Sequence, residues 1–586
     1  MAIWRLKNNK TDVTPLMNAL KLNEVSARLL VNRGVTSKAD AKKFINPLRE
    51  HMEEFGDITN TDKAIDILKD SIAKNDKIVI YGDYDADGVM STVILYKGLE
   101  TVCNNLSYYI PHREKEGYGL NKHAINTLHS EGVNLIVACD NGISAIDEVE
   151  YAKSLGINII IIDHHESTKI GENEEILPPA DAIINPKQLN CTYPFKHMCA
   201  AALCYKFIYA FHDKKDNFDE LFIFASIATF CDVVDLIGEN RAIAYIGQQL
   251  INKSVTNIGL LALMKEKLVK IGAIDESTMG FTLGPCINAA GRLKTADIAV
   301  ELFLSDDEEK AKTLAKELSE LNEERKNLTR DATYEIEEEF LPKYVDDNIV
   351  VIYVDTIHES IAGIVAGRLK DNLYKPVIVL TKSTDDMAKG SARSVEGCNI
   401  FEEISKHRHL LDRFGGHEMA AGLSIPTKNI DEFRTLLNKE MSAEIKEEVI
   451  LIEKELPFEE VTFNFAQQLN YLRPFGKNNL DPIFGTKNVE VIELKIKGEK
   501  NTILFTFKTQ NCDRPIKGIY FGDVSKIYTL IETNFQSYDA EKIANGIFRT
   551  AKFFLDIVYS IGVNQYNGVT SLQLRVKDFR YPGVNE

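Results

Sequence analysis

The stretch Lys77-Ile78-Val79-Ile80-Tyr81-Gly82-Asp83-Tyr84-Asp85-Ala86-Asp87-Gly88 decides the fold of the first half of the chain. It opens with a short apolar run that is rich in β-branched residues, which predicts a buried strand. A loop of glycine and aspartate follows, and Ser91–Leu99 then shows helical periodicity. The stretch therefore predicts a strand, a loop and a helix in that order.

The same unit of strand and helix repeats along the chain. Further strands are predicted at 106–110, 135–138, 158–162 and 182–184, and further helices at 122–130 and 145–155. Strands that alternate with helices form a parallel, doubly wound sheet, and both faces of such a sheet are covered, which explains the continuous apolar runs. We therefore expect an α/β domain that binds its ligand beyond the carboxyl ends of the strands.

The rest of the sequence predicts further domains, because 586 residues are too many for one hydrophobic core. Residues 305–340 are highly charged and contain no Gly or Pro, which predicts a long, solvated connecting helix. A second α/β pattern begins at Ile349, and β-rich segments with turns end the chain and suggest a small barrel. The predicted divisions are an N-terminal helical segment at 1–50, the parallel α/β domain at 51–304, the connecting helix at 305–340, a smaller α/β domain at 341–448 and a β-barrel domain at 449–586.

Composition narrows the class of protein. No apolar run approaches the ~20 residues that span a bilayer, and the N-terminus lacks the apolar region of a signal peptide. The nine cysteines include no Cys-x-x-Cys pair, which argues against a zinc knuckle and fits a reducing cytoplasm. The net charge of −18 disfavours nucleic acid as a partner, but a local basic groove beside an acidic metal site is compatible with it.

The loop after the first strand carries three carboxylates, Asp83, Asp85 and Asp87, at every second position. Crowded anions repel one another unless a cation neutralises them, and hard oxygen ligands suit Mg²⁺ or Mn²⁺. An EF-hand has a similar spacing but needs an acid at position 12 and a preceding helix. Here that position is Ile94 and the preceding element is a strand, so we exclude the EF-hand.

Further acids and histidines follow later strands. Asp140 comes after 135–139, and Asp163-His164-His165 comes after 158–162. The carboxyl ends of parallel strands meet at one edge, and Asp232 could join them from a neighbouring helix, so these groups could hold two metal ions. Each acid alone also has a structural interpretation, because Asp often caps the helix after a strand. Asp163 is the best candidate for a structural role, orienting a histidine.

These segments resemble the motifs of the DHH phosphoesterase family. The resemblance implies two bound divalent ions, Mn²⁺ or Mg²⁺, and it implies that His165 lies by the scissile phosphate. It also implies the following metal ligands: Asp85, Asp87, Asp140, His164 and Asp232, with Asp83 as an additional ligand. Some relatives have a ligating His where this chain has Tyr81, so one ion would have fewer ligands from the protein.

Other segments resemble the RecJ-type nucleases within this family. They are Ile110–Gly119 and Gly284–Leu293 in the first domain, and Gly390–Ser394 and Phe414–Gly422 in the second, which resembles the DHHA1 domain. The C-terminal β region resembles an OB-fold. The resemblance implies that Arg292 and Asn288 contact the scissile phosphate; that Arg113, Ser391 and Arg393 hold the 5′-phosphate; that Tyr118 stacks on a base; and that Gly415, Gly416, His417, Phe475 and Lys477 contact the nucleic acid. Cys286 replaces a residue that is often basic in the family, and it receives no role.

The resemblance implies a single-stranded-DNA-specific 5′→3′ exonuclease that releases 5′-mononucleotides by two-metal hydrolysis in DNA repair and recombination. It also suggests a helicase and a single-strand-binding protein as partners, and a monomer away from membranes. Two alternatives remain. One is a DHH phosphodiesterase for short oligonucleotides or cyclic dinucleotides, although such enzymes usually lack the long β domain. The other is an inactive repair scaffold, which would have lost ligands that this chain retains.

Overall fold

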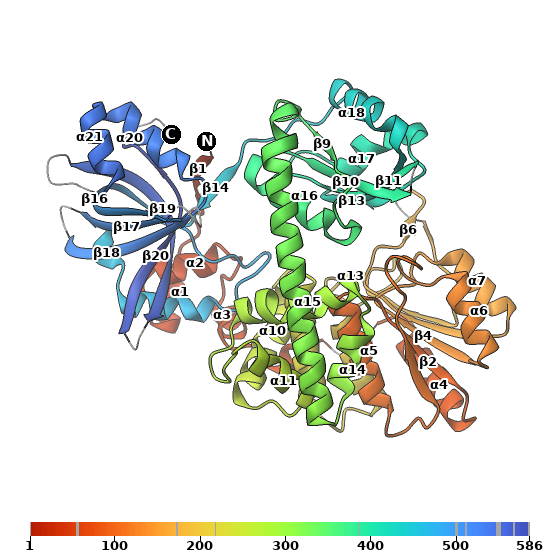
Figure 1. The fold of residues 1–586 in the computed structure, drawn as a ribbon. Helices are drawn as coiled ribbons and strands as arrows, with labels where there is room; N and C mark the ends of the chain where they lie inside the picture. Colours follow the sequence, from red (N-terminus) through yellow and green to blue (C-terminus); the bar gives the residue numbers. More distant parts are fainter. Residues whose placement is uncertain are drawn as a thin grey trace. The chain divides into compact units, whose positions relative to one another are not determined.

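The computed structural model describes residues 2–53, 58–171, 174–216, 218–384, 386–497, 502–509, 512–546, 552–566 and 569–583. The chain forms two compact units (Figure 1). The catalytic unit comprises Met52–Val234 and Gly238–Glu447, and the barrel unit comprises Met1–His51, Asp235–Ile237 and Glu448–Glu586. No helix in the described part of the chain is long and apolar enough to cross a membrane.

The first domain of the catalytic unit is built on a five-stranded parallel sheet, and all five predicted strands are confirmed. The strands, in their order across the sheet, are β3 (Leu106–Tyr109), β2 (Ile78–Tyr81), β4 (Leu135–Cys139), β5 (Asn158–Ile162) and β8 (Ala182–Ile184). The chain starts at β2, adds β3 on one side and then adds β4 on the other. This reversal opens a crevice at the carboxyl ends of β2 and β4, which is where doubly wound sheets bind ligands.

Helices cover both faces of this sheet. Alternate residues of a strand point to opposite faces, so Ile78 and Ile80 of β2 join one core, whereas Val79 and Tyr81 join the other. The helices of the first core include α4 (Thr61–Ala73), α5 (Ala86–Leu99) and α8 (Ala200–Phe211), and those of the second are α6 (Lys122–Ser130) and α7 (Ile146–Ser154).

A helical layer continues the domain beyond the sheet. Its elements are α9 (Asp219–Cys231), α10 (Gly238–Lys253), α11 (Ile258–Glu266), α12 (Glu276–Thr278), the π-helical turn η3 (Met279–Leu283), α13 (Gly284–Leu293) and α14 (Asp297–Leu304). The expected long helix is α15 (Glu308–Glu335), drawn in green in Figure 1, and a π-helical turn extends it over Ile336–Phe340. The helix is not simply solvated, because Ala311, Ala315 and Leu318 are buried in the first core. Its many charges concealed this apolar stripe.

The second domain of the catalytic unit has a mixed five-stranded sheet. Its order is β12 (Arg413–His417), β13 (Ala420–Pro426), β11 (Met387–Arg393), β10 (Val377–Thr384) and β9 (Val350–Tyr353). Only β9 and β10 pair in parallel, and the connection between them contains α16 (Ala362–Leu373). Helices α17 (Ile400–Ser405) and α18 (Ile430–Lys439) complete the domain.

The barrel unit confirms the predicted C-terminal OB-fold. Its strands are β16 (Phe484–Lys497), β17 (Thr502–Thr509), β18 (Cys512–Phe521), β19 (Phe553–Tyr566) and β20 (Val569–Arg580). The order β16-β17-β18-β20-β19 is closed by pairing of β19 with β16, and the helices α20 (Ser525–Asn534) and α21 (Ser537–Ala544) lie between β18 and β19 in the chain. Closure removes the exposed sheet edges that an open sheet would present.

The N-terminal segment is part of the barrel unit. It contains the expected helices, α1 (Thr14–Leu20), α2 (Glu24–Val31) and α3 (Lys38–Ile45), whose apolar side chains share one core with the barrel. It also contains a strand that the sequence analysis did not anticipate, β1 (Ile3–Leu6), which pairs in parallel with β14 (Val449–Ile452). Pairing between such distant segments leaves no local signal in the sequence.

Candidate metal centre and phosphate-binding cleft

The loop between β2 and α5 is held in a tight conformation by its own backbone and aspartates. The Asp85 carboxylate caps α5 and accepts hydrogen bonds from the backbone N–H groups of Asp87 at 2.9 Å and Gly88 at 3.1 Å. A Cβ atom at Gly88 would lie 2.5 Å from the carbonyl oxygen of Asp83, so only glycine fits there. Asp85 therefore has the capping role that such residues commonly play, and its second oxygen remains for a ligand.

The Asp87 carboxylate is fixed by the first turn of α8. Its two oxygens accept hydrogen bonds from the backbone N–H groups of Ala200 and Ala201, both at 2.8 Å. The carboxylate is therefore oriented before any ion binds, because the helix N-terminus favours a negative charge at this position.

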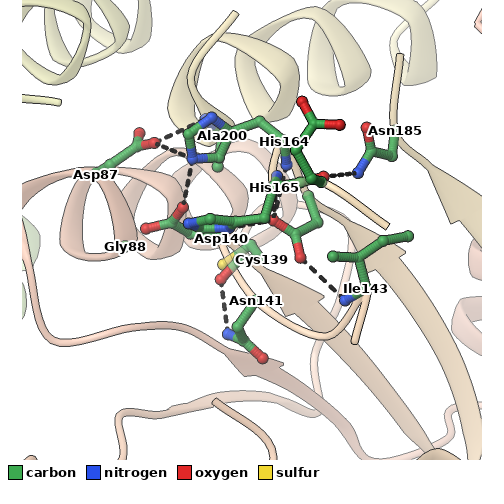
Figure 2. A network of polar contacts seen from close by, with 12 residues as sticks. Asp87, Gly88, Cys139, Asp140, Asn141, Ile143, His164, His165, Asn185 and Ala200 are labelled. Carbon is green, nitrogen blue, oxygen red and sulfur yellow. Dashed lines mark hydrogen bonds and ion pairs between the residues drawn. The ribbon is translucent and has the colours of Figure 1, made fainter. Parts of the chain in front are cut away.

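His164 lies at the centre of the acidic cluster (Figure 2). Its Nε2 atom is 3.2 Å from Oδ1 of Asp140, 3.7 Å from Oδ2 of Asp87 and 3.8 Å from Oδ2 of Asp232. Asp140 comes from the end of β4 in a left-handed conformation with φ of 64°, and Asp232 directly follows α9. The structure thus brings together acids from the two expected strand ends and from a neighbouring helix.

The ligand atoms fall into overlapping groups that suit two ions. Within each group they lie within 4.8 Å of one another, and the groups are Asp83, Asp85 and Asp140; Asp87, His164 and Asp232; and Asp140, His164 and His165. In the described structure, Oδ1 of Asp83 and Oδ1 of Asp140 are buried without a hydrogen-bond donor. Buried acceptors of this kind fit hard divalent cations, which take carboxylate oxygens as ligands.

Electrostatics also favours cations at this site. Burial, and then repulsion from neighbouring aspartates, raises the pKa of Asp87 to about 7 and that of Asp232 to about 8. The same two causes hold the pKa values of Asp83 and Asp140 well above their usual range. A bound cation would remove this repulsion and stabilise the ionised carboxylates.

The two adjacent histidines are in opposite charge states. Burial lowers the pKa of His164 to about 3, so its imidazole is neutral, as a metal ligand must be. Burial also opposes ionisation of His165, but the Asp163 carboxylate outweighs it and raises the pKa of His165 to about 9. Asp163 Oδ1 lies 2.7 Å from Nδ1 of His165, and its Oδ2 accepts a hydrogen bond from the backbone of Ile143 at 3.0 Å. Asp163 therefore orients His165, as expected, and leaves Nε2 of His165 for substrate.

A cavity of about 680 Å³ lies beside the metal centre in the catalytic unit. It is lined by residues of the Ile110–Gly119 segment, α13, α16 and the strands β11, β12 and β13. Six of the predicted contact residues are among them: Arg113, Tyr118, Arg292, Ser391, Arg393 and Gly415.

The arginines of this cavity have no carboxylate partner among the described residues. Arg292 donates a hydrogen bond to the carbonyl oxygen of Ser360 at 2.9 Å, and Arg393 donates one to Oγ of Ser391 at 2.7 Å. The Arg113 guanidinium lies 5.0 Å from the ring centre of Tyr84. Burial, together with Arg113 and other arginines nearby, lowers the pKa of Arg292 to about 10. Half-buried cations in such a cluster favour a bound anion, and guanidinium groups suit phosphate.

Tyr118 connects the cavity with the metal centre. Its side chain is 52% exposed, and its hydroxyl donates a hydrogen bond to the carbonyl oxygen of Asp140 at 2.9 Å. The same hydroxyl lies 3.2 Å from Nδ1 of His165. The ring is thus positioned at the mouth of the metal centre with a face free for stacking.

Family models match three parts of the chain: the N-terminal domain of the DHH family at residues 77–229, the DHHA1 domain at 346–443 and the RecJ OB domain at 452–578. The chain is 33% identical over 582 residues to the single-stranded-DNA-specific exonuclease RecJ of Bacillus subtilis, covering 98% of this chain and 70% of that one. The chain belongs to the RecJ family.

Other relatives agree with this assignment. The RecJ exonuclease of Haemophilus influenzae is 28% identical, with 96% of this chain and 97% of that one covered. Among solved structures, RecJ of Thermus thermophilus in complex with Mn²⁺ matches with a TM-score of 0.82 at 22% identity, covering all of this chain and 80% of that one. This structural likeness shows that the fold is that of RecJ.

The remaining predicted contacts lie outside the cavity lining. Asn288 instead accepts a hydrogen bond from the backbone N–H of Ala86 in the metal loop, at 2.8 Å. Gly416 and His417 lie at the end of the edge strand β12, next to Gly415. Phe475 and Lys477 belong to the barrel unit, where Phe475 packs against the core and Lys477 pairs with Asp235 at 3.1 Å. Their contacts with nucleic acid stay predictions.

Two departures from the family pattern have structural explanations. Tyr81 is buried on the face of the sheet covered by α6 and α7, and its hydroxyl donates a hydrogen bond to the carbonyl oxygen of Gly119 at 3.0 Å. Cys286 is buried on α13 and accepts a hydrogen bond from Nδ2 of Asn322 at 3.4 Å. Both side chains pack into the domain and neither lines the cavity.

Sequence reasoning missed several residues of the site. The Asn141 side chain joins the ends of β2 and β4, because its amide donates hydrogen bonds to the carbonyl oxygens of Gly82 at 3.1 Å and Cys139 at 2.9 Å. Lys389 and Arg413 line the cavity and add positive charge. Lys389 could have been found, because it alternates with Ser391 and Arg393 and therefore lies on the same face of one strand.

Proposed function

We propose that this chain is a metal-dependent exonuclease that degrades single-stranded DNA from its 5′ end and releases 5′-mononucleotides. One observation carries the proposal: a buried set of carboxylate and histidine ligands lies beside a cavity whose arginines have no carboxylate partners among the described residues. The first feature suits phosphodiester hydrolysis, and the second suits a terminal phosphate. RecJ relatives are named as single-stranded-DNA-specific exonucleases.

The acidic cluster would hold two divalent ions, Mn²⁺ or Mg²⁺. The proposed ligands are Asp83, Asp85, Asp87, Asp140, His164 and Asp232. Bound ions would supply a nucleophilic water at neutral pH and stabilise an in-line displacement at phosphorus. RecJ of Thermus thermophilus has been crystallised with Mn²⁺ and with Mg²⁺.

The residues of the chain position and stabilise the substrate. Arg113, Ser391 and Arg393 hold the 5′-phosphate in the cavity, which fixes the polarity of attack. Arg292 and the protonated His165, through its Nε2, stabilise the negative charge that develops on the scissile phosphate. Asn288 holds the metal loop through Ala86, so it acts on the phosphate by positioning that loop.

The size of the cavity supports a preference for single strands. A volume of about 680 Å³ is in the range of sites for small ligands and would admit a nucleotide but not a duplex end. The exposed ring of Tyr118 would stack on a base, which every base permits because each has an aromatic face. The substrate is therefore expected to be bound without sequence preference.

The alternative function is cleavage of short oligonucleotides or cyclic dinucleotides. It is disfavoured because the RecJ OB domain model matches residues 452–578, and an OB-fold is a platform for longer single strands. An inactive scaffold is disfavoured because the complete set of metal ligands is present and assembled.

The deciding experiment uses DNA labelled at the 5′ or the 3′ end, single-stranded or duplex, with Mn²⁺ or Mg²⁺. We expect labelled mononucleotides to appear at once from 5′-labelled single strands and only at the end of digestion from 3′-labelled ones. Release from the 3′ end first, cleavage of duplex ends at the same rate, or activity in the presence of a chelator would contradict the proposal.

We further propose a role in DNA repair and recombination, with a helicase and a single-strand-binding protein as partners, in a cytoplasmic monomer. The cytoplasm is supported by the nine cysteines, all of which are free. Sedimentation of the purified protein, alone and mixed with each candidate partner, tests the oligomeric state and the two interactions.

A further inference from the structure

Phe281 is a large aromatic side chain that is 80% exposed on the catalytic unit. It lies in the π-helical turn η3, which runs directly into α13. Such turns are rare and occur frequently at functional sites. Neither the fold nor the proposed hydrolysis uses this side chain.

Phe281 shares one helical face with residues of the site. Phe281, Pro285, Asn288 and Arg292 are spaced by three or four residues, which places them within an arc of about 60° on a helix. These positions are partly or fully exposed, whereas the residues between them are buried, namely Leu283, Gly284, Cys286, Ile287, Ala289, Ala290 and Gly291. The exposed face therefore carries the phosphate-binding Arg292 at one end, Asn288 at the metal loop and Phe281 at the other end.

The Phe281 end of this face lies close to the metal centre. The Sγ atom of Cys231 contacts the carbonyl oxygen of Met279 at 3.9 Å, and a Cβ atom at Gly284 would lie 2.3 Å from that sulfur. The junction of η3 and α13 therefore packs tightly on the end of α9, directly before the proposed ligand Asp232.

A second exposed apolar residue lies at the same place. Val233 follows Asp232, is 60% exposed and has a φ of 54°. This left-handed conformation is costly for a β-branched residue, and such strain is found mostly at functional sites. Apolar side chains are thus presented to solvent next to the metal centre, where a strand leaving it would find them.

We propose that Phe281 stacks on a base of the single strand on the 3′ side of the scissile phosphate. The inference rests on the proposed function, which places the 5′-phosphate at the arginine end of the helix face. The eleven residues from Phe281 to Arg292 span roughly 16 Å of helix. That length corresponds to about five nucleotides at the ~3.4 Å spacing of stacked bases, and to fewer in an extended strand. A dinucleotide bound at the 5′-phosphate site would not reach Phe281.

The test compares Phe281→Ala with Phe281→Tyr, which restores an aromatic ring, and with Leu268→Ala, which removes another exposed apolar side chain (87% exposed) away from this helix. The first readout is binding without divalent ions of single strands that carry 2-aminopurine at successive positions from a 5′-phosphate. We expect fluorescence quenching near the third to fifth nucleotide in the wild type, Phe281→Tyr and Leu268→Ala, and its loss in Phe281→Ala.

The second readout is the ratio of KM for a long 5′-phosphorylated strand to KM for a 5′-phosphorylated dinucleotide. Phe281→Ala is expected to raise this ratio by roughly fivefold to a hundredfold, the range measured for removal of one stacking ring. Quenching that persists in Phe281→Ala, or an equal effect on both substrates, would overturn the inference. If the wild type cleaves neither substrate, the proposed function fails, while the quenching experiment still decides the role of Phe281.

Discussion

At the scale of single residues, the metal centre places function in conflict with stability. Asp140 is buried, its left-handed backbone is strained, and its Oδ1 has no hydrogen-bond donor in the described structure. Burial and then the nearby Asp87 and Asp85 hold its pKa well above the usual range. These costs make sense only if a cation completes the site.

The conflict predicts opposite effects of Asp140→Asn on activity and on stability. We expect the nuclease activity to fall by roughly a hundredfold or more, because even outer partners of a metal site can matter by up to that factor. Removing one of several buried like charges should raise the Tm of the metal-free protein by about 2 °C, which corresponds to ~1 kcal/mol in a domain of this size. Calorimetry in a chelator, and again with Mn²⁺, measures the gain and the smaller stabilisation by metal.

Asp147→Asn is the matched control, because it removes the same charge from an exposed position in the first turn of α7. Its activity should match that of the wild type. Full activity of Asp140→Asn, or a lower Tm of its metal-free form, would show that Asp140 is not a ligand in an electrostatically strained cluster.

At the scale of elements, the phosphate cavity is built from a strand and a helix that approach each other closely. Lys389, Ser391 and Arg393 alternate along β11 and line the cavity, whereas Ala388 and Ala392 point into the core. The first turn of α16 faces them through Gly363. A Cβ atom there would lie 2.8 Å from Nη2 of Arg393 and 3.0 Å from Oγ of Ser391.

Gly363→Ala should therefore weaken recognition of the 5′-phosphate without unfolding the domain, because the atoms it displaces are flexible side-chain ends. We expect KM for 5′-phosphorylated strands to rise by roughly tenfold, the effect of impairing one hydrogen bond to a charged group. Strands with a 5′-hydroxyl should show a smaller change. Steady-state kinetics on the two substrates measures the difference.

Gly367→Ala lies one turn later on α16, where a Cβ atom would meet nothing within 4 Å. This control should leave both KM values unchanged and stabilise the helix by about 0.5–1 kcal/mol. If both variants behaved alike, close packing at Gly363 would have no part in phosphate recognition.

At the scale of the whole molecule, the sequence predicted what depends on local pattern and on the direction of parallel strands. Asp85, Asp140 and His164 could be brought together on paper because the carboxyl ends of such strands share one edge. Pairing of β1 with β14, and closure of the barrel by β19 and β16, depend on contacts between distant segments and were not foreseen. The resemblance suggested roles for Phe475 and Lys477, but the structure places them in the other unit.

The charge of the whole molecule leads to a last prediction. The net charge is −18, yet Arg113, Arg292, Lys389, Arg393 and Arg413 all line one cavity. If local charge governs binding, single-strand affinity must fall with salt as if the protein were basic. Five neutralised phosphates give a slope of log K against log salt of about −3.5, at ~0.7 per phosphate on single strands. Fluorescence anisotropy of a labelled 5′-phosphorylated strand in a chelator measures this slope.

Single variants separate the cavity from the overall charge. Arg393→Ala should make the slope less negative by about 0.7, because one phosphate contact is lost. Lys312→Ala removes the same charge from an exposed position on α15 that does not line the cavity, and it should leave the slope as it is. Equal shifts in both variants would mean that the strand responds to the net charge of the protein, and a slope near zero would mean that the cavity arginines do not bind phosphate. The predicted difference between the two variants is what a focused basic cavity on an acidic molecule requires, because beyond about 10 Å salt screens the other charges.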